Sequence, residues 1–235
     1  MPNFEIMLTG IHFLLTYKCI YECDHCFVYS SPRAEGTFTF EQVNAALDEA
    51  GKTGTIEWIY FEGGEPFLYY PLLIDCIKAA VSRGFKTGIV TNAYFATSIK
   101  DAERWLLPLK ELNINDLSIS DDRLHSGDIT NSPASIAIKA AKNLGLRVNS
   151  ISIEEPVIRS CEIPRKKGEP VAGGDVMFRG RAADKLVNDL PLVNRAEFDE
   201  CRFEELINPE RYILTHTAMF RFARVLQLAT CGKNL

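Results

Sequence analysis

The chain has 235 residues, of which 46% are hydrophobic and 24% charged, and its formal net charge is −5. These values fit one large or two small globular domains, and they exclude a disordered chain, a collagen repeat and a disulfide-dense miniprotein. No run approaches the roughly 18–20 apolar residues of a membrane span, and no secretory signal is expected at the N-terminus. The negative charge argues against general nucleic-acid binding. We therefore expect a cytoplasmic protein without membrane or nucleic-acid partners.

Hydrophobic runs and turn signals predict strands that alternate with helices. Strands are expected at 11–16, 55–61, 85–91, 116–120, 146–153 and 176–178. Helices are expected at 40–52, 71–82, 100–107 and 133–144. The alternation predicts an α/β fold with a parallel sheet, and the number of units favours a partial (β/α)6 TIM-like barrel. We expect this barrel at 1–190 and a short C-terminal extension at 191–235. Functional residues should follow the carboxyl ends of the strands.

The chain has an odd number of cysteines, seven, and three of them lie within eight residues after the first predicted strand. Cys19, Cys23 and Cys26 have the spacing C-x3-C-x2-C. In a chain expected to be cytoplasmic, this pattern favours a metal site over disulfides. Thiolates suit either zinc or an iron–sulfur cluster. Three thiolates would leave one iron of a four-iron cluster without a protein ligand, and such an open position is typical of a reactive site.

A C-x3-C-x2-C loop directly after the first strand resembles the radical S-adenosylmethionine (radical SAM) superfamily. The resemblance implies that Cys19, Cys23 and Cys26 hold a [4Fe-4S] cluster and that SAM chelates its fourth iron. It also implies that the reduced cluster cleaves SAM to methionine and a 5′-deoxyadenosyl radical, which abstracts hydrogen from a substrate. His25 matches a usually aromatic family position that packs near the adenine. The competing interpretation is a structural zinc loop or a chance cluster of cysteines.

A second motif, FEGGEP at 61–66, follows the second predicted strand. Adjacent glycines allow backbone to approach a ligand closely, and a glutamate can accept a hydrogen bond from an ammonium group. The motif resembles the family's GGEP element, which contacts the methionyl group of SAM. On that match, four residues are expected to bind SAM: Gly63, Gly64, Glu65 and Pro66. Taken alone, the motif is also compatible with a tight turn, but its place after a strand and about forty residues past the cysteines makes it specific.

Polar residues also follow the third and fourth predicted strands. The resemblance implies that four of them bind the ribose and carboxylate of SAM: Asn92, Ser118, Ser120 and Asp121. The alternative is that Asn92 and Asp121 cap the helices that follow. The next polar residues are candidates for lining the substrate site: Asp122, Arg123 and His125. The sequence assigns no catalytic residue.

The segment Arg179–Ala182 contains a GRA element of the kind that is common in radical SAM proteins with C-terminal cluster extensions. On this resemblance, Arg181 binds the SAM carboxylate or a substrate anion. The alternative is that both arginines of the segment are solvated surface residues.

The remaining cysteines are expected to differ in role. Cys76 lies in an apolar helical run and is expected in the core. Cys161 lies in a segment that is expected to be irregular, where it is either a metal ligand or an exposed thiol. Cys201 resembles the start of a cysteine-bearing (SPASM/twitch-like) extension, which would hold an auxiliary iron–sulfur cluster.

The residues after Arg211 differ in character from the rest of the chain. Residues 212–235 contain three basic residues and no acidic residue, and they fit an apolar-basic helix at 217–228. The residues from Tyr212 onward can be back-translated, and the third base of each codon can be read together with the first two bases of the next codon. Compatible codons then permit the string HLDPYGNVQICQGFAIGNLWEKP. That string resembles the C-terminal cluster region of radical SAM relatives. We therefore hypothesise that residues 212–235 are a frameshifted tail, in which case Cys231 has no role.

The sequence thus predicts an oxygen-sensitive radical SAM enzyme that takes electrons from a donor such as a ferredoxin or flavodoxin. Its substrate is unassigned, and only analogy favours peptide modification or cofactor assembly. The alternative is a non-catalytic iron–sulfur or zinc-binding protein on the same fold. The presence of Glu65 and both glycines argues against this alternative.

Overall fold

The computed structural model describes residues 8–127, 131–158, 172–188, 190 and 209–216. A six-stranded parallel sheet runs through it, in the order β5-β4-β3-β2-β1-β8. Its strands are β1 (Gly10–Thr16), β2 (Trp58–Gly63), β3 (Lys86–Thr91), β4 (Asp116–Ser120), β5 (Val148–Ile151) and β8 (Arg211–Leu214). A separate antiparallel pair joins β6 (Val157–Ile158) to β7 (Ala172–Gly173).

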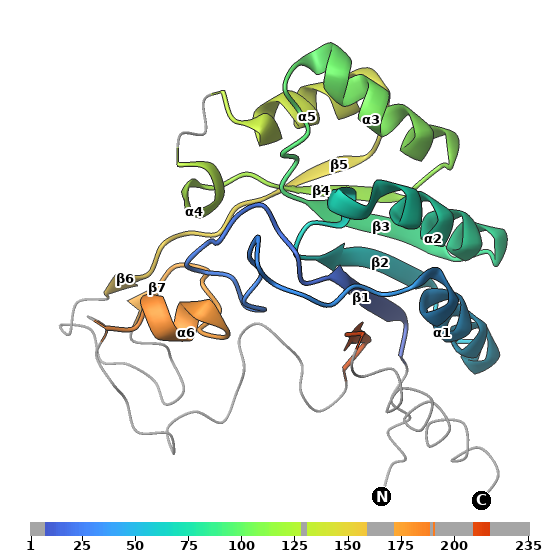
Figure 1. Ribbon diagram of the computed structural model, residues 1–235, viewed down its shortest axis with the longest axis horizontal. Helices are drawn as coiled ribbons and strands as arrows, with labels where there is room; N and C mark the ends of the chain where they lie inside the picture. The colour runs from blue at the N-terminus through green and yellow to red at the C-terminus, as the bar shows by residue number, and fades with distance from the viewer. Residues whose placement is uncertain (1–7, 128–130, 159–171, 189, 191–208, 217–235) are drawn as a thin grey trace, which may run out of the picture.

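The four longest of the described helices lie along one face of the sheet (Figure 1). They are α1 (Phe40–Thr53), α2 (Tyr70–Ser82), α3 (Ile99–Glu111) and α5 (Pro133–Asn143). Shorter helical segments lie in the loops: η1 (Pro66–Tyr69), α4 (Arg123–Ser126) and α6 (Arg181–Lys185). The sheet is open rather than closed into a barrel, so the α/β class and the partial-barrel architecture predicted from the sequence are confirmed. None of the helices within the described ranges has the length and apolarity needed to cross a bilayer.

Polar side chains cap the starts of three of the long helices. Thr39 and Gln42 form a complete capping box at the start of α1, since each side chain bonds the backbone N–H of the other. Ser98 and Ser132 accept hydrogen bonds from N3 backbone groups of α3 and α5. The sequence also predicts an end of the third helix near 107, because Pro108 lacks an N–H.

The helix α3 instead continues through Pro108 to Glu111. Leu109 is fully buried one residue after the proline, which favours the longer helix. Packing of Leu109 in the core therefore outweighs the local effect of the proline.

The core lies between the sheet and the four long helices. Ile11, Phe13 and Leu15 alternate along β1 and are fully buried. They belong to one hydrophobic cluster that includes Val43 and Leu47 of α1. Burial of such apolar faces is the main favourable term in folding, so this cluster fixes the strands and leaves their carboxyl ends free to carry polar residues.

The prediction of a sixth strand at 176–178 is wrong. Those residues are irregular, and the strand at the edge of the sheet next to β1 is β8. Gly10–Phe13 pair in parallel with Arg211–Leu214, so the main sheet takes a strand from the segment that the sequence assigns to a C-terminal extension. Val176 is nonetheless buried, which explains why an apolar triplet there resembles a strand.

Candidate active site

The loop that carries the three cysteines, residues 17–36 and here named the cysteine loop, leaves β1 at the carboxyl edge of the sheet. Backbone hydrogen bonds close its base: Tyr17 N–H donates to Gly36 O at 2.8 Å, and Cys19 N–H donates to Ser31 O at 3.1 Å. The loop therefore has a defined shape before any metal binds.

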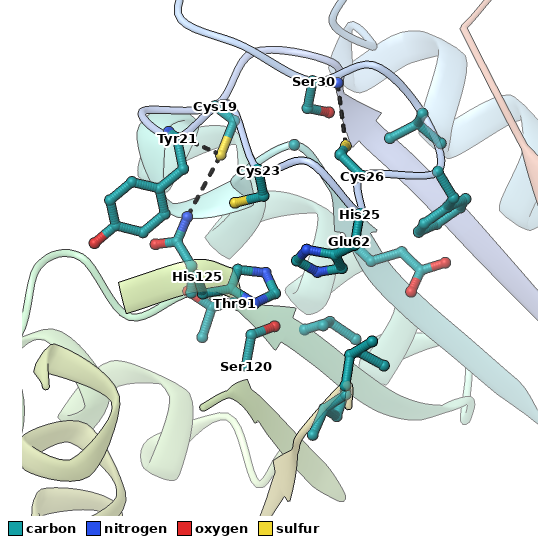
Figure 2. A pocket seen from close by; sticks show the side chains of 18 of the residues that line it. Cys19, Tyr21, Cys23, His25, Cys26, Ser30, Glu62, Thr91, Ser120 and His125 are labelled. Atoms are coloured by element: carbon teal, nitrogen blue, oxygen red, sulfur yellow. Dashed lines mark hydrogen bonds between the residues drawn. The ribbon is translucent and has the colours of Figure 1, made fainter. Parts of the chain in front are cut away.

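A cavity of about 500 Å³ opens between the cysteine loop and the strand ends (Figure 2). Such a volume lies within the usual range for small-molecule sites. All three cysteines of the motif contribute to its wall. The ends of β2, β3, β4 and β5 contribute Glu62, Gly63, Val90, Thr91, Ser120 and Ile151.

The three thiols fit a soft metal centre. They form no disulfide, and the Sγ atoms of Cys19 and Cys26 accept hydrogen bonds from the backbone N–H groups of Tyr21 (3.4 Å) and Ser30 (3.3 Å). Burial raises the pKa of Cys19 to about 11 and that of Cys23 to about 12, so these thiols are protonated at neutral pH in the metal-free chain. Metal binding therefore releases protons. Unpaired thiols with N–H donors around them match the ligands that iron–sulfur clusters use.

The glycines of the GGEP motif let the end of β2 meet the cysteine loop. A Cβ on Gly63, whose φ is +133°, would lie 2.4 Å from Thr16 O, and one on Gly64 would lie 2.2 Å from Lys18 O. The Gly64 N–H donates to Thr16 O at 2.6 Å. Both glycines also line the cavity, so they serve close backbone packing and leave the cavity wall free of side chains.

Glu65 and Pro66 lie behind the cavity wall rather than in it. Glu65 has no exposed surface, and its carboxylate accepts hydrogen bonds from Phe67 N–H (3.0 Å), Thr91 Oγ1 (2.8 Å) and Asn92 N–H (2.8 Å). Burial raises the pKa of this carboxyl to about 7, although the three donors act in the opposite direction. The described contacts of Glu65 therefore join the GGEP motif to the end of β3, and its expected contact with an ammonium group stays a prediction.

The four polar residues expected to bind SAM after β3 and β4 divide into two pairs. Asn92 and Ser120 line the cavity, and Asn92 Nδ2 lies 3.5 Å from the Sγ of Cys19 as a donor. Ser118 lies two residues deeper in β4, where its hydroxyl donates to Asp116. Asp121 accepts a hydrogen bond from Ser132, the N-cap of α5, but the residue that caps the next helix, α4, is Asp122, so the alternative that Asp121 is a helix cap is wrong.

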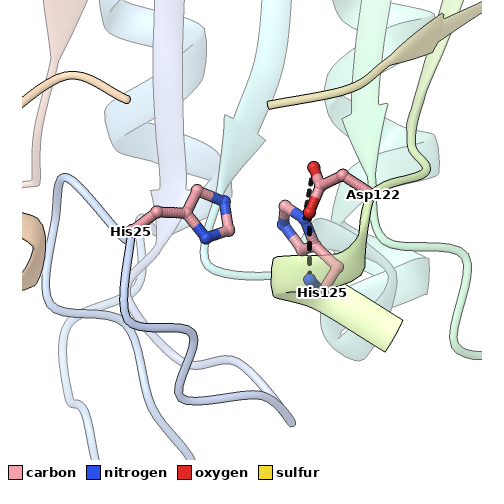
Figure 3. A group of neighbouring side chains, drawn as sticks. All are labelled: His25, Asp122 and His125. Atoms are coloured by element: carbon pink, nitrogen blue, oxygen red, sulfur yellow. Dashed lines mark hydrogen bonds and ion pairs between the residues drawn. The ribbon is translucent and has the colours of Figure 1, made fainter. Parts of the chain in front are cut away.

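His25 from the cysteine loop meets Asp122 and His125 of the α4 region at the cavity (Figure 3). The rings of the two histidines lie edge to face, with centroids 4.5 Å apart. Nδ1 of His125 lies 2.9 Å from both carboxylate oxygens of Asp122, which also accept the N–H groups of His125 and Ile153. Burial lowers the pKa of His25 to about 4, so this ring is neutral at pH 7.

The Asp122–His125 pair has the geometry of an oriented imidazole. A carboxylate only accepts hydrogen bonds, so Asp122 favours the tautomer of His125 that carries a proton on Nδ1, and the ring lines the cavity. Ligand atoms of His25, Asp122 and His125 lie within 4.8 Å of one another, as in a metal site. Because the Asp122 oxygens already accept three N–H groups, we interpret the trio as a hydrogen-bonded wall of the cavity.

Arg181 does not line the cavity. It is only 7% exposed, and its guanidinium donates to the backbone carbonyls of Cys23 and Ser30. The expectation of a solvated surface arginine is therefore wrong for Arg181. Its expected contact with a SAM carboxylate or a substrate anion stays a prediction, because the described donors of its side chain face the cysteine loop.

Several cavity residues carry no motif and were not expected. Tyr21, Phe27 and Val28 come from the cysteine loop, and Asp175 and Met177 come from the irregular segment before α6. The feature of the sequence that could have indicated a role for these residues is their position next to the cysteine motif or the GRA element. Cys76 is buried in α2, as expected, whereas Cys161, Cys201 and Cys231 lie outside the described residues.

Comparison with curated proteins gives relatives that match part of this chain. A protein of Bacillus subtilis (strain 168) named "Putative peptide biosynthesis protein YydG" is 30% identical over 112 residues, which cover 48% of this chain and 35% of that protein. The "Tungsten-containing aldehyde ferredoxin oxidoreductase cofactor-modifying protein" of Pyrococcus furiosus is 26% identical over 222 residues, covering 88% of this chain and 60% of that protein. The chain thus spans about a third and three-fifths of the length of these relatives.

Among solved structures, BtrN in complex with AdoMet and 2-DOIA is similar, with a TM-score of 0.49 and 19% identity, over 62% of this chain and 56% of that one. The family model described as the Radical SAM superfamily matches residues 13–154. These residues contain most of β1, the whole cysteine loop, the GGEP motif and the strands through β5. Because the match covers more than half of the chain, the protein belongs to the radical SAM superfamily.

Proposed function

We propose that this protein is a radical SAM enzyme that binds a [4Fe-4S] cluster through Cys19, Cys23 and Cys26. The reduced cluster would cleave SAM to methionine and a 5′-deoxyadenosyl radical that abstracts hydrogen from the substrate. The observation that carries the proposal is the arrangement of three unpaired thiols around one cavity at the carboxyl edge of a parallel sheet. Ligands of such sheets commonly bind at this edge.

Different residues of the cavity wall would bind SAM and exclude water. Gly63 and Gly64 keep the wall beside the cysteines free of side chains, and Asn92 offers an amide near Cys19. His25, Ser120 and Asn92 would hold the SAM nucleoside and methionyl groups. The apolar side chains of Phe27, Val28 and Ile151 would exclude water from the reacting groups.

His125 is the best candidate for contact with the substrate. Its ring lines the cavity, and Asp122 fixes its Nδ1 as a donor, so Nε2 can accept a hydrogen bond from a substrate N–H or O–H group. The names of the relatives support a peptide or a cofactor as the substrate class. An electron donor such as a ferredoxin or flavodoxin would reduce the cluster, and we place the reaction in the cytoplasm.

Anaerobic reconstitution tests the proposal. The purified chain is loaded with iron and sulfide, reduced with dithionite and incubated with SAM, and 5′-deoxyadenosine is measured by liquid chromatography. We expect one cluster per chain, a change in its EPR spectrum on addition of SAM, and 5′-deoxyadenosine even without substrate. The matched blank is the chain with Cys19, Cys23 and Cys26 all replaced by alanine.

Two outcomes would contradict the proposal. A chain with full cluster content that changes no spectrum with SAM and forms no 5′-deoxyadenosine would favour the non-catalytic iron–sulfur protein. A chain that retains only zinc after anaerobic purification would exclude both cluster hypotheses.

A further inference from the structure

The start of α6 contacts the cysteine loop, although the two segments are more than 150 residues apart in sequence. The contacts come from Gly180, Arg181 and Asp184. Arg181 provides three donors: Nη1 to Cys23 O at 2.7 Å, Nη2 to Ser30 O at 2.6 Å, and its backbone N–H to Cys26 O at 2.9 Å. Two of these acceptors are carbonyls of cysteines in the motif. The contacts therefore span the part of the loop that contains the second and third thiols.

Gly180 shows how closely the two segments approach. Its φ is +55°, and a Cβ there would lie 2.4 Å from the carbonyl carbon and oxygen of Phe27 and 2.7 Å from Cys26 O. A side chain at this position would push α6 away from the cysteine loop. On the exposed side, the hydroxyl of Tyr29 donates to Asp184 at 2.7 Å and adds a fourth connection.

The charge of Arg181 adds an electrostatic role to this mechanical one. The guanidinium is 7% exposed and lies against the backbone carbonyls of Cys23 and Ser30, so its positive charge is held beside the loop that carries the thiols. A buried cation next to a thiolate ligand favours negative charge at that ligand. The same cation favours the reduced state of a cluster, because reduction adds an electron.

We propose that Gly180, Arg181 and Asp184 form a clamp that sets the geometry of the cysteine loop and raises the reduction potential of the metal centre it holds. Arg181 is then a positioning residue rather than a ligand for SAM or substrate. The electrostatic part rests on the proposed function, because it requires a cluster on Cys19, Cys23 and Cys26. The mechanical part concerns the loop itself and is present in the metal-free chain.

The test compares Arg181→Gln, Arg181→Lys and Arg33→Gln in the full chain. Arg33 is the matched control, since it lies on the same loop with an 84% exposed side chain paired to Glu22. Hydrogen–deuterium exchange of residues 23–30 is measured before cluster loading. We expect exchange to be at least about tenfold faster in Arg181→Gln and unchanged in Arg33→Gln, because only Arg181 makes buried hydrogen bonds that join the loop to another segment, whereas the Arg33–Glu22 pair is exposed and lies within the loop.

After anaerobic loading, the midpoint potential of the cluster is measured at matched iron content. We expect a more negative potential in Arg181→Gln and a value near that of the unmodified chain in Arg181→Lys, which keeps the charge but loses the bidentate grip. Faster loop exchange in Arg181→Lys with little change of potential would separate the two roles. The mild variant Tyr29→Phe should accelerate exchange about twofold to fivefold at 27–31 without affecting folding.

Equal loop exchange in the unmodified chain, Arg181→Gln and Tyr29→Phe would overturn the clamp, and so would an equal increase in Arg33→Gln. An unchanged potential in Arg181→Gln would overturn its electrostatic part. If the unmodified chain takes up no cluster, the proposed function fails, while exchange in the metal-free chains still decides the mechanical part.

Discussion

Glu65 illustrates how single buried groups support this site without touching its cavity. Its carboxylate is fully buried and accepts three hydrogen bonds, two of which tie the GGEP motif to Thr91 and Asn92. Asn92 in turn donates to the Sγ of Cys19. One carboxylate thus connects β2, β3 and a metal-ligand candidate, and its protonation state affects the stability of the whole edge.

Glu65→Gln should change how stability depends on pH. The folded chain holds the Glu65 proton with a pKa of about 7, against a usual pKa of 4.5, so it binds the proton more tightly than the unfolded chain. This contribution is complete below about pH 4.5 and is lost as the pH rises through about 7, by up to about 3 kcal/mol. Urea unfolding of the metal-free chain between pH 4.5 and 8 should therefore show a steeper fall of stability in the unmodified chain. Parallel curves for the two proteins would contradict this expectation.

Alanine at any one of Cys19, Cys23 or Cys26 should abolish cluster binding, whereas Cys76→Ala should not. We expect iron content to fall by more than about tenfold in each of the first three, because a missing ligand costs more than a missing outer-shell partner. Cys76 is fully buried in α2, so Cys76→Ala should cost about 1 kcal/mol of stability and leave iron content unchanged. Iron and sulfide assays with thermal unfolding measure both effects. Equal iron loss in Cys76→Ala would assign that thiol to the centre.

At the scale of elements, the site depends on the close contact between the end of β2 and the cysteine loop. Gly64 donates its N–H to Thr16 O and leaves no room for a Cβ beside Lys18 O. The sequence suggests that these glycines admit a ligand, but the structure assigns the space next to them to the protein's own backbone. The same close packing leaves the cavity wall at Gly63 and Gly64 free of side chains.

Gly64→Ala should be destabilising, and Gly51→Ala is its matched control. A Cβ on Gly64 would meet the Lys18 carbonyl at 2.2 Å, whereas one on Gly51, inside α1, would meet no atom within 4 Å. We expect Gly64→Ala to lose about 1–3 kcal/mol through overpacking and Gly51→Ala to gain about 1 kcal/mol through helix propensity. Denaturant unfolding of the two variants checks the signs. A neutral Gly64→Ala would mean that the loop moves aside at no cost.

The sequence predicts local features of this fold well and distant contacts poorly. The strand at 116–120 is predicted with its observed limits, because polar residues and turn signals flank a short apolar run. Ser120 lines the cavity, but Asp121 faces Ser132 because adjacent residues at a strand end point in opposite directions. The role of Arg181 was out of reach, since its acceptors are backbone carbonyls 151 and 158 residues away.

At the scale of the molecule, β8 shows that the main sheet is not completed by residues 1–190 alone. Residues 211–214 form its edge strand beside β1, and three of these four residues belong to the segment that we hypothesise to be frameshifted. A strand requires only an extended backbone and compatible side chains, so either reading frame can supply one here. The auxiliary cluster that Cys201 suggests would lie in the same part of the chain.

The nucleotide sequence of the gene tests the frame directly. We expect the codons after Arg211 to encode HLDPYGNVQICQGFAIGNLWEKP in the neighbouring frame, so that restoring one base yields that string. A chain with the restored frame should then bind more iron per molecule than the present chain, because the restored string replaces Cys231 by a cysteine placed next to a strand–turn–strand pattern. Codons that do not spell this string would end the frameshift hypothesis.

The pairing of β1 with β8 also has a consequence for how the chain is made. β1 is among the first elements to leave the ribosome, but its partner on one edge lies about 200 residues later. At roughly 5–20 residues per second, that edge stays unpaired for about 10–40 seconds during synthesis. An exposed strand edge is a template for pairing with other chains. We therefore expect slow translation or a lack of chaperones to reduce the fraction of the synthesised chain that is recovered as soluble, folded protein.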